Sequence, residues 1–122
     1  MDLSFVLDTN VVLYHLSNRL AEDLPDGPLC ISIITEMELL SFPGLSEEEE
    51  EEVQRLLKSI NIIDLSEPIK NEAIQLRRAF KLKLPDAIIL ATAKNLSAPL
   101  ITNDVELSKV EGIEVKTINL SA

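Results

Sequence analysis

Two acidic residues closely follow apolar segments, the positions where α/β proteins usually have their functional sites. Asp8 comes directly after the apolar run Leu3–Leu7, and Asp104 comes just after the apolar segment Pro99–Ile101. Apolar runs of this length suit buried strands. In open parallel sheets, sites form at the carboxyl ends of the strands. We therefore expect both carboxylates to lie in one crevice at the same edge of a sheet.

Two further acids lie on helices that are predicted to begin at the same edge of the sheet. Glu38 lies on the helix predicted after the strand around Cys30, and Asp86 lies in the first turn of the helix that Pro85 begins. A cluster of carboxylates can hold one or two Mg²⁺ ions, which prefer oxygen ligands and retain several waters. Such an ion activates water and neutralises phosphate charge, as phosphodiester hydrolysis at neutral pH requires. Without metal, clustered carboxylates repel one another, and at least one pKa should rise.

Polar side chains beside these acids could orient a carboxylate or a bound water. Asn10 follows Asp8 by two residues, and Thr102 and Asn103 precede Asp104. Helix capping is the competing interpretation for these side chains. The acids have local alternatives too, because Asp8 could cap the first helix, Asp86 could stabilise a helix start and Asp104 could make a turn. We favour capping for Thr9 and Ser32, and both roles stay open for Asn10 and Thr102.

The elements that must position these residues alternate between strand and helix. Such alternation predicts a parallel sheet with right-handed crossovers and helices on its faces. We expect about five strands. The predicted strands are Leu3–Leu7, Leu29–Ile31, Asn61–Asp64, Pro99–Ile101 and Ile113–Thr117, and the predicted helices are Thr9–Leu16, Ile33 to about Ser41, Glu47–Ser59, one capped by Ser66 and reaching Phe80, and Pro85–Leu96.

Length and composition favour one domain, residues 1–122, with an aliphatic core. The chain has 46% hydrophobic but only 3% aromatic residues. It holds one cysteine, Cys30, and one histidine, His15, so neither a disulfide nor a Cys/His zinc site is expected. Cys30 is interpreted as a core residue and His15 as structural or at the surface. A metal here would need oxygen ligands, which favours Mg²⁺ or Mn²⁺.

The net charge of −10 argues against tight binding to nucleic acid. The charge is unevenly distributed, however, which weakens this argument. Six of the acids lie in Glu47–Glu52, whereas Lys70–Lys94 contains six basic and two acidic residues, a net charge of +4. Both segments are also interpretable as solvated helix faces. The N-terminus shows no signal-peptide pattern and no apolar run reaches the ~20 residues of a membrane span. We expect a cytoplasmic protein that does not enter a membrane.

Four short motifs, in order and spacing, resemble the PIN domain family, and in particular its VapC type of toxin ribonuclease. The resemblance covers nearly the whole chain. The motifs are Leu7–Asn10, Ser32–Leu40, Leu84–Ala87 with Ala91–Ala93, and Leu100–Asp104.

The resemblance implies a three-layer α/β/α sandwich around a parallel sheet of about five strands. It implies a Mg²⁺- or Mn²⁺-dependent endoribonuclease that cuts RNA. Asp8, Glu38, Asp86 and Asp104 match the family's metal-binding catalytic acids, whereas Thr102 and Asn10 match polar positions beside them. It also implies a homodimer and an antitoxin partner that inserts into the active-site groove.

Glu36 is a weaker candidate than Glu38, because the family's glutamate directly precedes a Leu-Leu pair and helical spacing directs the two side chains apart. Two other functions stay open. The first is a binding or regulatory module that keeps the fold and cuts nothing. The second is an aspartyl-phosphate hydrolase with Asp8 as nucleophile, which the Asn10 position disfavours because such enzymes usually carry a second aspartate there.

Overall fold

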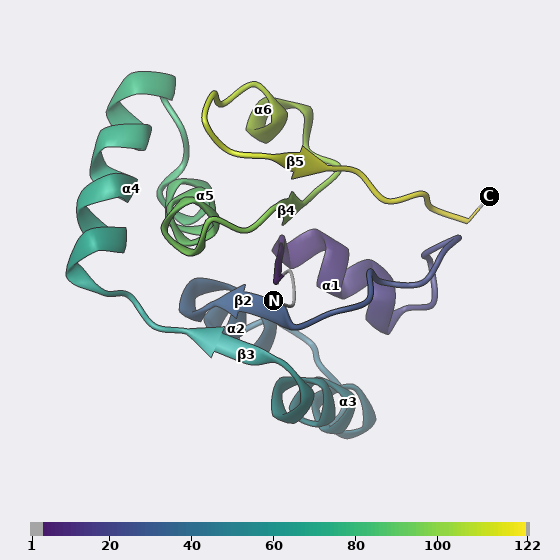
Figure 1. Ribbon diagram of the computed structural model, residues 1–122. Coiled ribbons are helices and arrows are strands. Elements are labelled where there is room, and N and C mark those ends of the chain that lie inside the picture. Colours follow the sequence, from purple (N-terminus) through teal and green to yellow (C-terminus); the bar gives the residue numbers. More distant parts are fainter. Residues whose placement is uncertain (1–3, 122) are drawn as a thin grey trace.

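The computed structural model describes residues 4–121 and contains one five-stranded sheet (Figure 1). The strand order is β3-β2-β1-β4-β5, and every neighbouring pair is parallel, as predicted. Leu3, where the first strand was predicted to begin, lies outside the described residues. The strands are β1 (Phe5–Leu7), β2 (Leu29–Ser32), β3 (Asn61–Ile63), β4 (Leu100–Ile101) and β5 (Val115–Lys116).

Six helices connect these strands in the described part of the chain. Five agree with the predicted helices to within about one residue at each end, whereas the short α6 was not predicted. The helices are α1 (Thr9–Leu16), α2 (Ile33–Leu40), α3 (Glu47–Ser59), α4 (Glu67–Phe80), α5 (Leu84–Leu96) and α6 (Val105–Ser108). None of the helices within residues 4–121 has the length and apolar character needed to cross a membrane.

Serine caps fix the beginnings of three helices. The hydroxyls of Ser32, Ser46 and Ser66 accept hydrogen bonds from the first-turn N–H groups of α2, α3 and α4. Ser46 and Glu49 form a reciprocal capping box, so the run of glutamates begins α3 as an exposed, solvated helix end. The capping interpretation of Ser32 is therefore confirmed.

Strand residues alternate between the two faces of the sheet, and each face has its own core. Val6 of β1 packs in a cluster with side chains from α4, α5 and α6. Its neighbours Phe5 and Leu7 pack in a second cluster with side chains from α1, α2 and α3. Helices therefore cover both faces of the sheet, and the molecule is the three-layer α/β/α sandwich that was expected.

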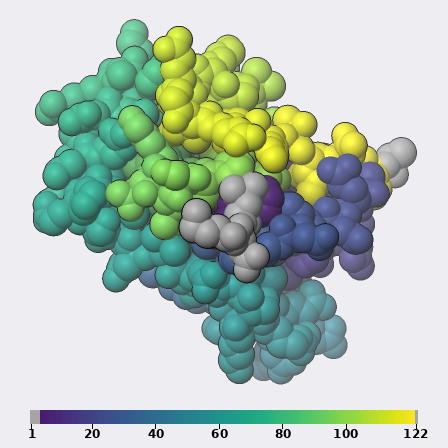
Figure 2. Space-filling view, in the orientation of Figure 1, coloured from purple at the N-terminus to yellow at the C-terminus, as the bar shows by residue number. Residues whose placement is uncertain are grey.

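The C-terminal segment returns to the loop that follows α1. Leu20 and Leu120 form an isolated antiparallel bridge, and the Ala21 N–H donates to the Asn119 carbonyl at 2.8 Å. In Figure 2 the yellow C-terminal segment lies against the blue residues that follow α1. This contact ties the C-terminal segment to the loop that follows α1.

The order of the strands reverses at β1. The chain leaves β1 for β2 on one side, and β4 occupies the other side. Such a reversal of strand order opens a crevice at the carboxyl ends of the two central strands. The residues that follow β1 and β4 therefore meet at this edge.

Candidate metal centre

Asp8 is the most deeply placed of the four candidate acids. It follows β1, caps α1 and is only 6% exposed. Its Oδ1 accepts a hydrogen bond from the Thr9 N–H at 2.8 Å, and its Oδ2 accepts one from the Thr102 hydroxyl at 2.6 Å. Each carboxylate oxygen offers about two acceptor sites, so both oxygens retain room for a cation.

Thr102 links Asp8 to the turn that carries Asp104. The Thr102 hydroxyl donates to Asp8 and accepts a hydrogen bond from the Asp104 N–H at 3.1 Å. Thr102 is buried at the end of β4, whereas Asp104 is exposed and caps α6 by accepting from the Glu106 N–H. One hydroxyl therefore holds together the residues that follow the two central strands.

Glu38 reaches the same edge from α2. Its Oε1 accepts a hydrogen bond from the Thr9 hydroxyl at 2.8 Å, and that hydroxyl also lies 3.0 Å from the hydroxyl of Thr35. Thr9 is the first residue of α1 and Asp8 is its cap, so the prediction that Thr9 caps this helix is wrong. The side chain of Thr9 instead crosses to α2, because Asp8 already fills the capping position.

Asp86 lies in the first turn of α5 and is half-buried. Burial raises the pKa of its carboxyl, and the negative charges of Asp8, Asp104 and Glu38 raise it further, while Lys83 opposes them. Burial also raises the pKa of Asp8, with added contributions from Asp104 and Glu38, against the hydrogen bonds from Thr102 and Thr9. The four acids therefore lie close enough to act on one another electrostatically.

The chemistry of this donor set fits a hard divalent cation. All four groups are carboxylates, and Mg²⁺ and Mn²⁺ prefer such oxygen ligands. Within residues 4–121, no three His, Cys, Asp or Glu side chains are gathered closely enough to enclose a metal ion. Like charges repel, so without a cation or a proton among them these carboxylates stay apart. Burial is the main cause of the raised pKa values of Asp8 and Asp86, and the smaller contribution of the neighbouring acids is a repulsion that a cation would relieve.

Several other polar residues singled out in the sequence lie elsewhere or make other contacts. The Asn103 side chain pairs with the backbone of Ile118, accepting from its N–H and donating to its carbonyl, each at 2.8 Å. Asn10 is exposed and forms no side-chain hydrogen bond with another of the described residues. Cys30 is buried in the core on the α4–α5 face, as predicted, and His15 is exposed on α1.

A groove leads from Glu38 over α1 and α2 toward α3. Its polar end, about 280 Å³, is lined by Thr9, Asn10 and Glu38 together with Leu13, Leu39 and Phe42. The same three apolar side chains continue into an apolar hollow of about 370 Å³ with Glu49 and Glu52 on its lining. The groove is therefore apolar along its floor and acidic at its polar end and its rim.

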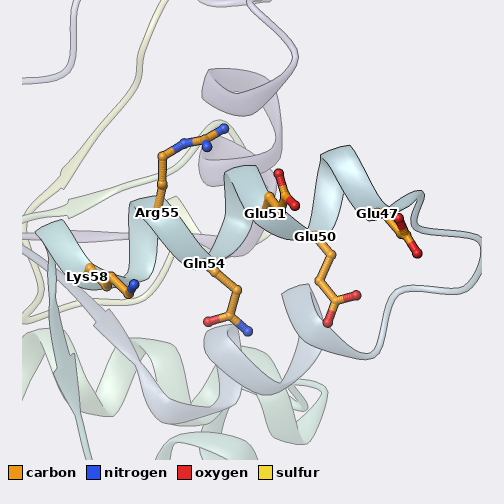
Figure 3. Close-up of a pocket in the computed structure, with 6 residues that line it drawn as sticks. All are labelled: Glu47, Glu50, Glu51, Gln54, Arg55 and Lys58. Atoms are coloured by element: carbon orange, nitrogen blue, oxygen red, sulfur yellow. The ribbon is translucent and has the colours of Figure 1, made fainter.

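A second depression runs along the exposed side of α3 and is unrelated to the four acids. Figure 3 shows glutamates toward the start of the helix, and Arg55 and Lys58 toward its end. This distribution complements the helix dipole, which favours negative charge at the first turn and positive charge at the last. We therefore interpret this surface as a solvated helix face.

Two residues of the site were not identified from the sequence. Thr35 is fully buried and hydrogen-bonds to Thr9, and Lys83 is the cation whose charge opposes the rise in the pKa of Asp86. Thr35 precedes Glu38 by three residues, a spacing that places both on one side of a helix. That spacing was a usable signal, whereas nothing local distinguishes Lys83 from its basic neighbours.

The fold agrees with the comparisons to known proteins. The sequence matches the PIN domain family over residues 5–113. No curated protein matches the chain. The chain therefore belongs to the PIN domain family.

Solved structures place it near the VapC-like members of that family. A chain of a toxin-antitoxin complex from Klebsiella pneumoniae is 34% identical and superposes with a TM-score of 0.75, covering 88% of this chain and 93% of that one. A chain of VapBC2 from Rickettsia felis, bound to a DNA fragment from its promoter, is 19% identical with a TM-score of 0.81, covering 96% and 100%. VapBC-1 from nontypeable Haemophilus influenzae is 24% identical with a TM-score of 0.77, covering 94% and 98%. The resemblance to the VapC type is thus confirmed.

Proposed function

We propose that this protein is a Mg²⁺- or Mn²⁺-dependent endoribonuclease and the toxin of a toxin-antitoxin pair. The observation that supports the proposal most strongly is the environment of the Asp8 carboxyl. This carboxyl is buried at the end of the central strand, is held by two hydrogen bonds, and has a pKa raised by burial and by neighbouring acids. A carboxylate buried among other acids destabilises the metal-free protein, and a bound cation would offset that cost.

Asp8, Glu38, Asp86 and Asp104 are the residues that would hold the metal. A bound divalent ion would supply an activated water and neutralise charge on the scissile phosphate. The chain's own contribution is to aim the carboxylates. Thr102 orients Asp8 and the Asp104 turn, and Thr9 orients Glu38. Such outer hydrogen bonds set both the direction and the basicity of metal ligands.

An RNA substrate must approach a protein with a net charge of −10. Lys83 lies close enough to Asp86 to oppose the rise in its pKa, so it is placed to meet a phosphate beside the metal. The basic residues of α4 extend positive charge away from that point, since Lys70–Lys94 carries a net +4. We propose that this side of the molecule receives the RNA backbone, with modest affinity.

The groove over α1 and α2 suits the antitoxin partner. Its floor contains Leu13, Leu39 and Phe42, and Phe42 is 53% exposed. Its rim carries Glu49 and Glu52. This combination fits an amphipathic segment with basic residues, whose apolar face fills the groove and whose charges meet the acidic rim. A segment seated there would also reach Glu38 and block the metal centre.

The homodimer expected from the family resemblance remains part of the proposal. Ile74 and Phe80 of α4 and Leu84 of α5 are each at least 40% exposed. Exposed apolar side chains of this size are typical of association surfaces. Light scattering after size-exclusion chromatography tests this directly, because a monomer at micromolar concentration would contradict it.

The deciding experiment is cleavage of a mixed RNA pool by the purified chain, with and without Mg²⁺ or Mn²⁺. Asp8→Asn and Glu38→Gln should abolish cleavage while remaining folded. Glu36→Gln is the matched control, because it removes an acid from the same helix and should cut normally. Metal-dependent cleavage that survives Asp8→Asn would refute the assigned site. No cleavage together with no metal binding would favour a catalytically silent binding module.

A further inference from the structure

The hydroxyl of Thr35 is the starting point, because it is buried without an obvious structural need. Thr35 lies on α2 and its side chain is fully buried. Burying a hydroxyl is unfavourable unless it forms a hydrogen bond. Its side-chain partner is the hydroxyl of Thr9, at 3.0 Å. The bond therefore joins α2 to the first residue of α1.

The direction of this hydrogen bond follows from counting protons. A threonine hydroxyl has one proton to donate. Thr9 donates its proton to Glu38 Oε1 at 2.8 Å, because an ionised carboxylate can only accept. Thr35 must therefore donate to Thr9. The result is a directed chain from Thr35 through Thr9 to Glu38, and a hydroxyl that accepts one bond donates the next more strongly.

Thr9 also aligns Asp8. Its backbone N–H donates to Asp8 Oδ1 at 2.8 Å, while its side chain donates to Glu38 Oε1. A single residue therefore sets the orientation of two candidate ligands that come from different elements. Glu38 has the longer and more flexible side chain of the two, so it has more rotamer freedom to lose.

We propose that Thr35 and Thr9 are positioning residues that hold Glu38 in the orientation required to bind the metal. This inference rests on the proposed metal-dependent function. The two hydroxyls reduce the rotamer freedom that Glu38 would otherwise lose when the cation binds. Their contribution should therefore appear in metal affinity as well as in stability.

The test measures Mn²⁺ affinity directly, from the electron paramagnetic resonance signal of free aqueous Mn²⁺ during titration. Thr9→Val should weaken binding about 10- to 100-fold, the range expected when an outer hydrogen bond to a metal ligand is removed. Thr35→Val should weaken it about two- to tenfold, since Thr9 still reaches Glu38 but is held less firmly. Thr9→Ser and Thr35→Ser should restore affinity to near the wild-type value, because serine keeps the hydroxyl.

Thr92→Val is the matched control. Thr92 is also buried on a helix, and its hydroxyl donates to the Ile88 carbonyl at 2.7 Å, within α5 itself. This variant should bind Mn²⁺ as the wild type does. Thermal unfolding without metal is recorded for every variant, so that a loss of folding is not mistaken for a loss of affinity.

The outcomes separate the two proposals. If the wild type binds Mn²⁺ and the valine variants bind it equally well, the threonines only link α1 to α2 and the inference is overturned. Wild-type protein that is folded and binds no Mn²⁺ overturns the proposed function and the positioning role together. Should Thr35→Val fail to fold, the comparison of Thr9→Val with Thr9→Ser decides the matter, because Thr9 is partly exposed.

Discussion

Replacing Thr102 by valine tests how strongly one buried hydroxyl supports the metal centre. Valine has nearly the same shape, so the core around β4 should stay packed, while the donor to Asp8 and the acceptor for the Asp104 N–H are both lost. Asp104 is exposed, and water can replace its lost partner. Asp8 is 6% exposed, so its ionised carboxylate loses a bond that water does not readily replace.

The expected loss of stability follows from that bond. A hydrogen bond to a charged group contributes about 1.5–3 kcal/mol, so we take about 2 kcal/mol at neutral pH. Unfolding entropy is about 2.1 cal/mol/K per residue, which for 122 residues amounts to about 0.26 kcal/mol/K. The melting temperature of the metal-free Thr102→Val protein should therefore fall by about 8 °C.

The dependence on pH distinguishes this mechanism from a general packing defect. Thr102 lowers the pKa of the Asp8 carboxyl, although burial leaves that pKa raised overall. Removing the hydroxyl raises the folded-state pKa further. The loss of stability is therefore largest above the variant's folded pKa, and it shrinks as the pH falls through the variant's value and then the wild type's.

The assay is thermal unfolding of metal-free protein at a series of pH values, with Thr92→Val as control. Thr92 donates to a neutral backbone carbonyl, so its small destabilisation should not change with pH. The reasoning is refuted if Thr102→Val melts within a degree or so of the wild type, or if its loss of stability is the same at neutral and acidic pH.

Three further predictions concern Asp8, the bound Mn²⁺ ion and Lys83. Asp8→Asn should raise the melting temperature of the metal-free protein at neutral pH, because folding raises the pKa of the Asp8 carboxyl and so makes its charged form unfavourable. The gain should disappear below pH 3.8, the pKa of the unfolded carboxyl. A variant less stable than the wild type at neutral pH would contradict this prediction. Mn²⁺ at about 100 times its dissociation constant should add about 2.7 kcal/mol to the free energy of unfolding of the wild type, measured by denaturant titration, and nothing to that of Asp8→Asn. Lys83→Ala should raise KM for RNA with little change in kcat, and should reduce the slope of log affinity against log salt by about one. Equal salt slopes for Lys83→Ala and wild type would show that Lys83 does not contact the RNA phosphates.

The sequence carries enough local information to predict most of the elements. Apolar runs predicted the five strands, and serines at the expected offsets predicted where α2 and α4 begin. These features depend on neighbours in the chain, which is why they can be recognised without a structure. The short α6 was missed because four residues show no helical periodicity, and its cap, Asp104, was assigned to another role.

The assignment of individual polar side chains was less successful. Thr9 was interpreted as a cap, yet Asp8 caps α1 and Thr9 bonds to Glu38, which lies 29 positions further along the chain. Capping preferences depend only on residue type and position, so they cannot tell whether Asp8 or Thr9 will instead bond to a distant residue. Thr35 escaped notice because threonine within an apolar helix is usually only a packing residue, and nothing nearby reveals the hydroxyl it will meet.

By itself, the sequence determined the class of fold and the alternation of elements, because both depend on residue type and periodicity. It also supplied the candidate set of acids, through their positions relative to strand ends and through the family resemblance. Only the tertiary structure decided the strand order, the two bonds that hold Asp8, and the chain of hydroxyls leading to Glu38. Thr102 lies 94 positions from Asp8, so their contact exists only once β4 has paired beside β1. Long-range pairing creates the site, and no local pattern encodes which side chains it will bring within hydrogen-bonding distance.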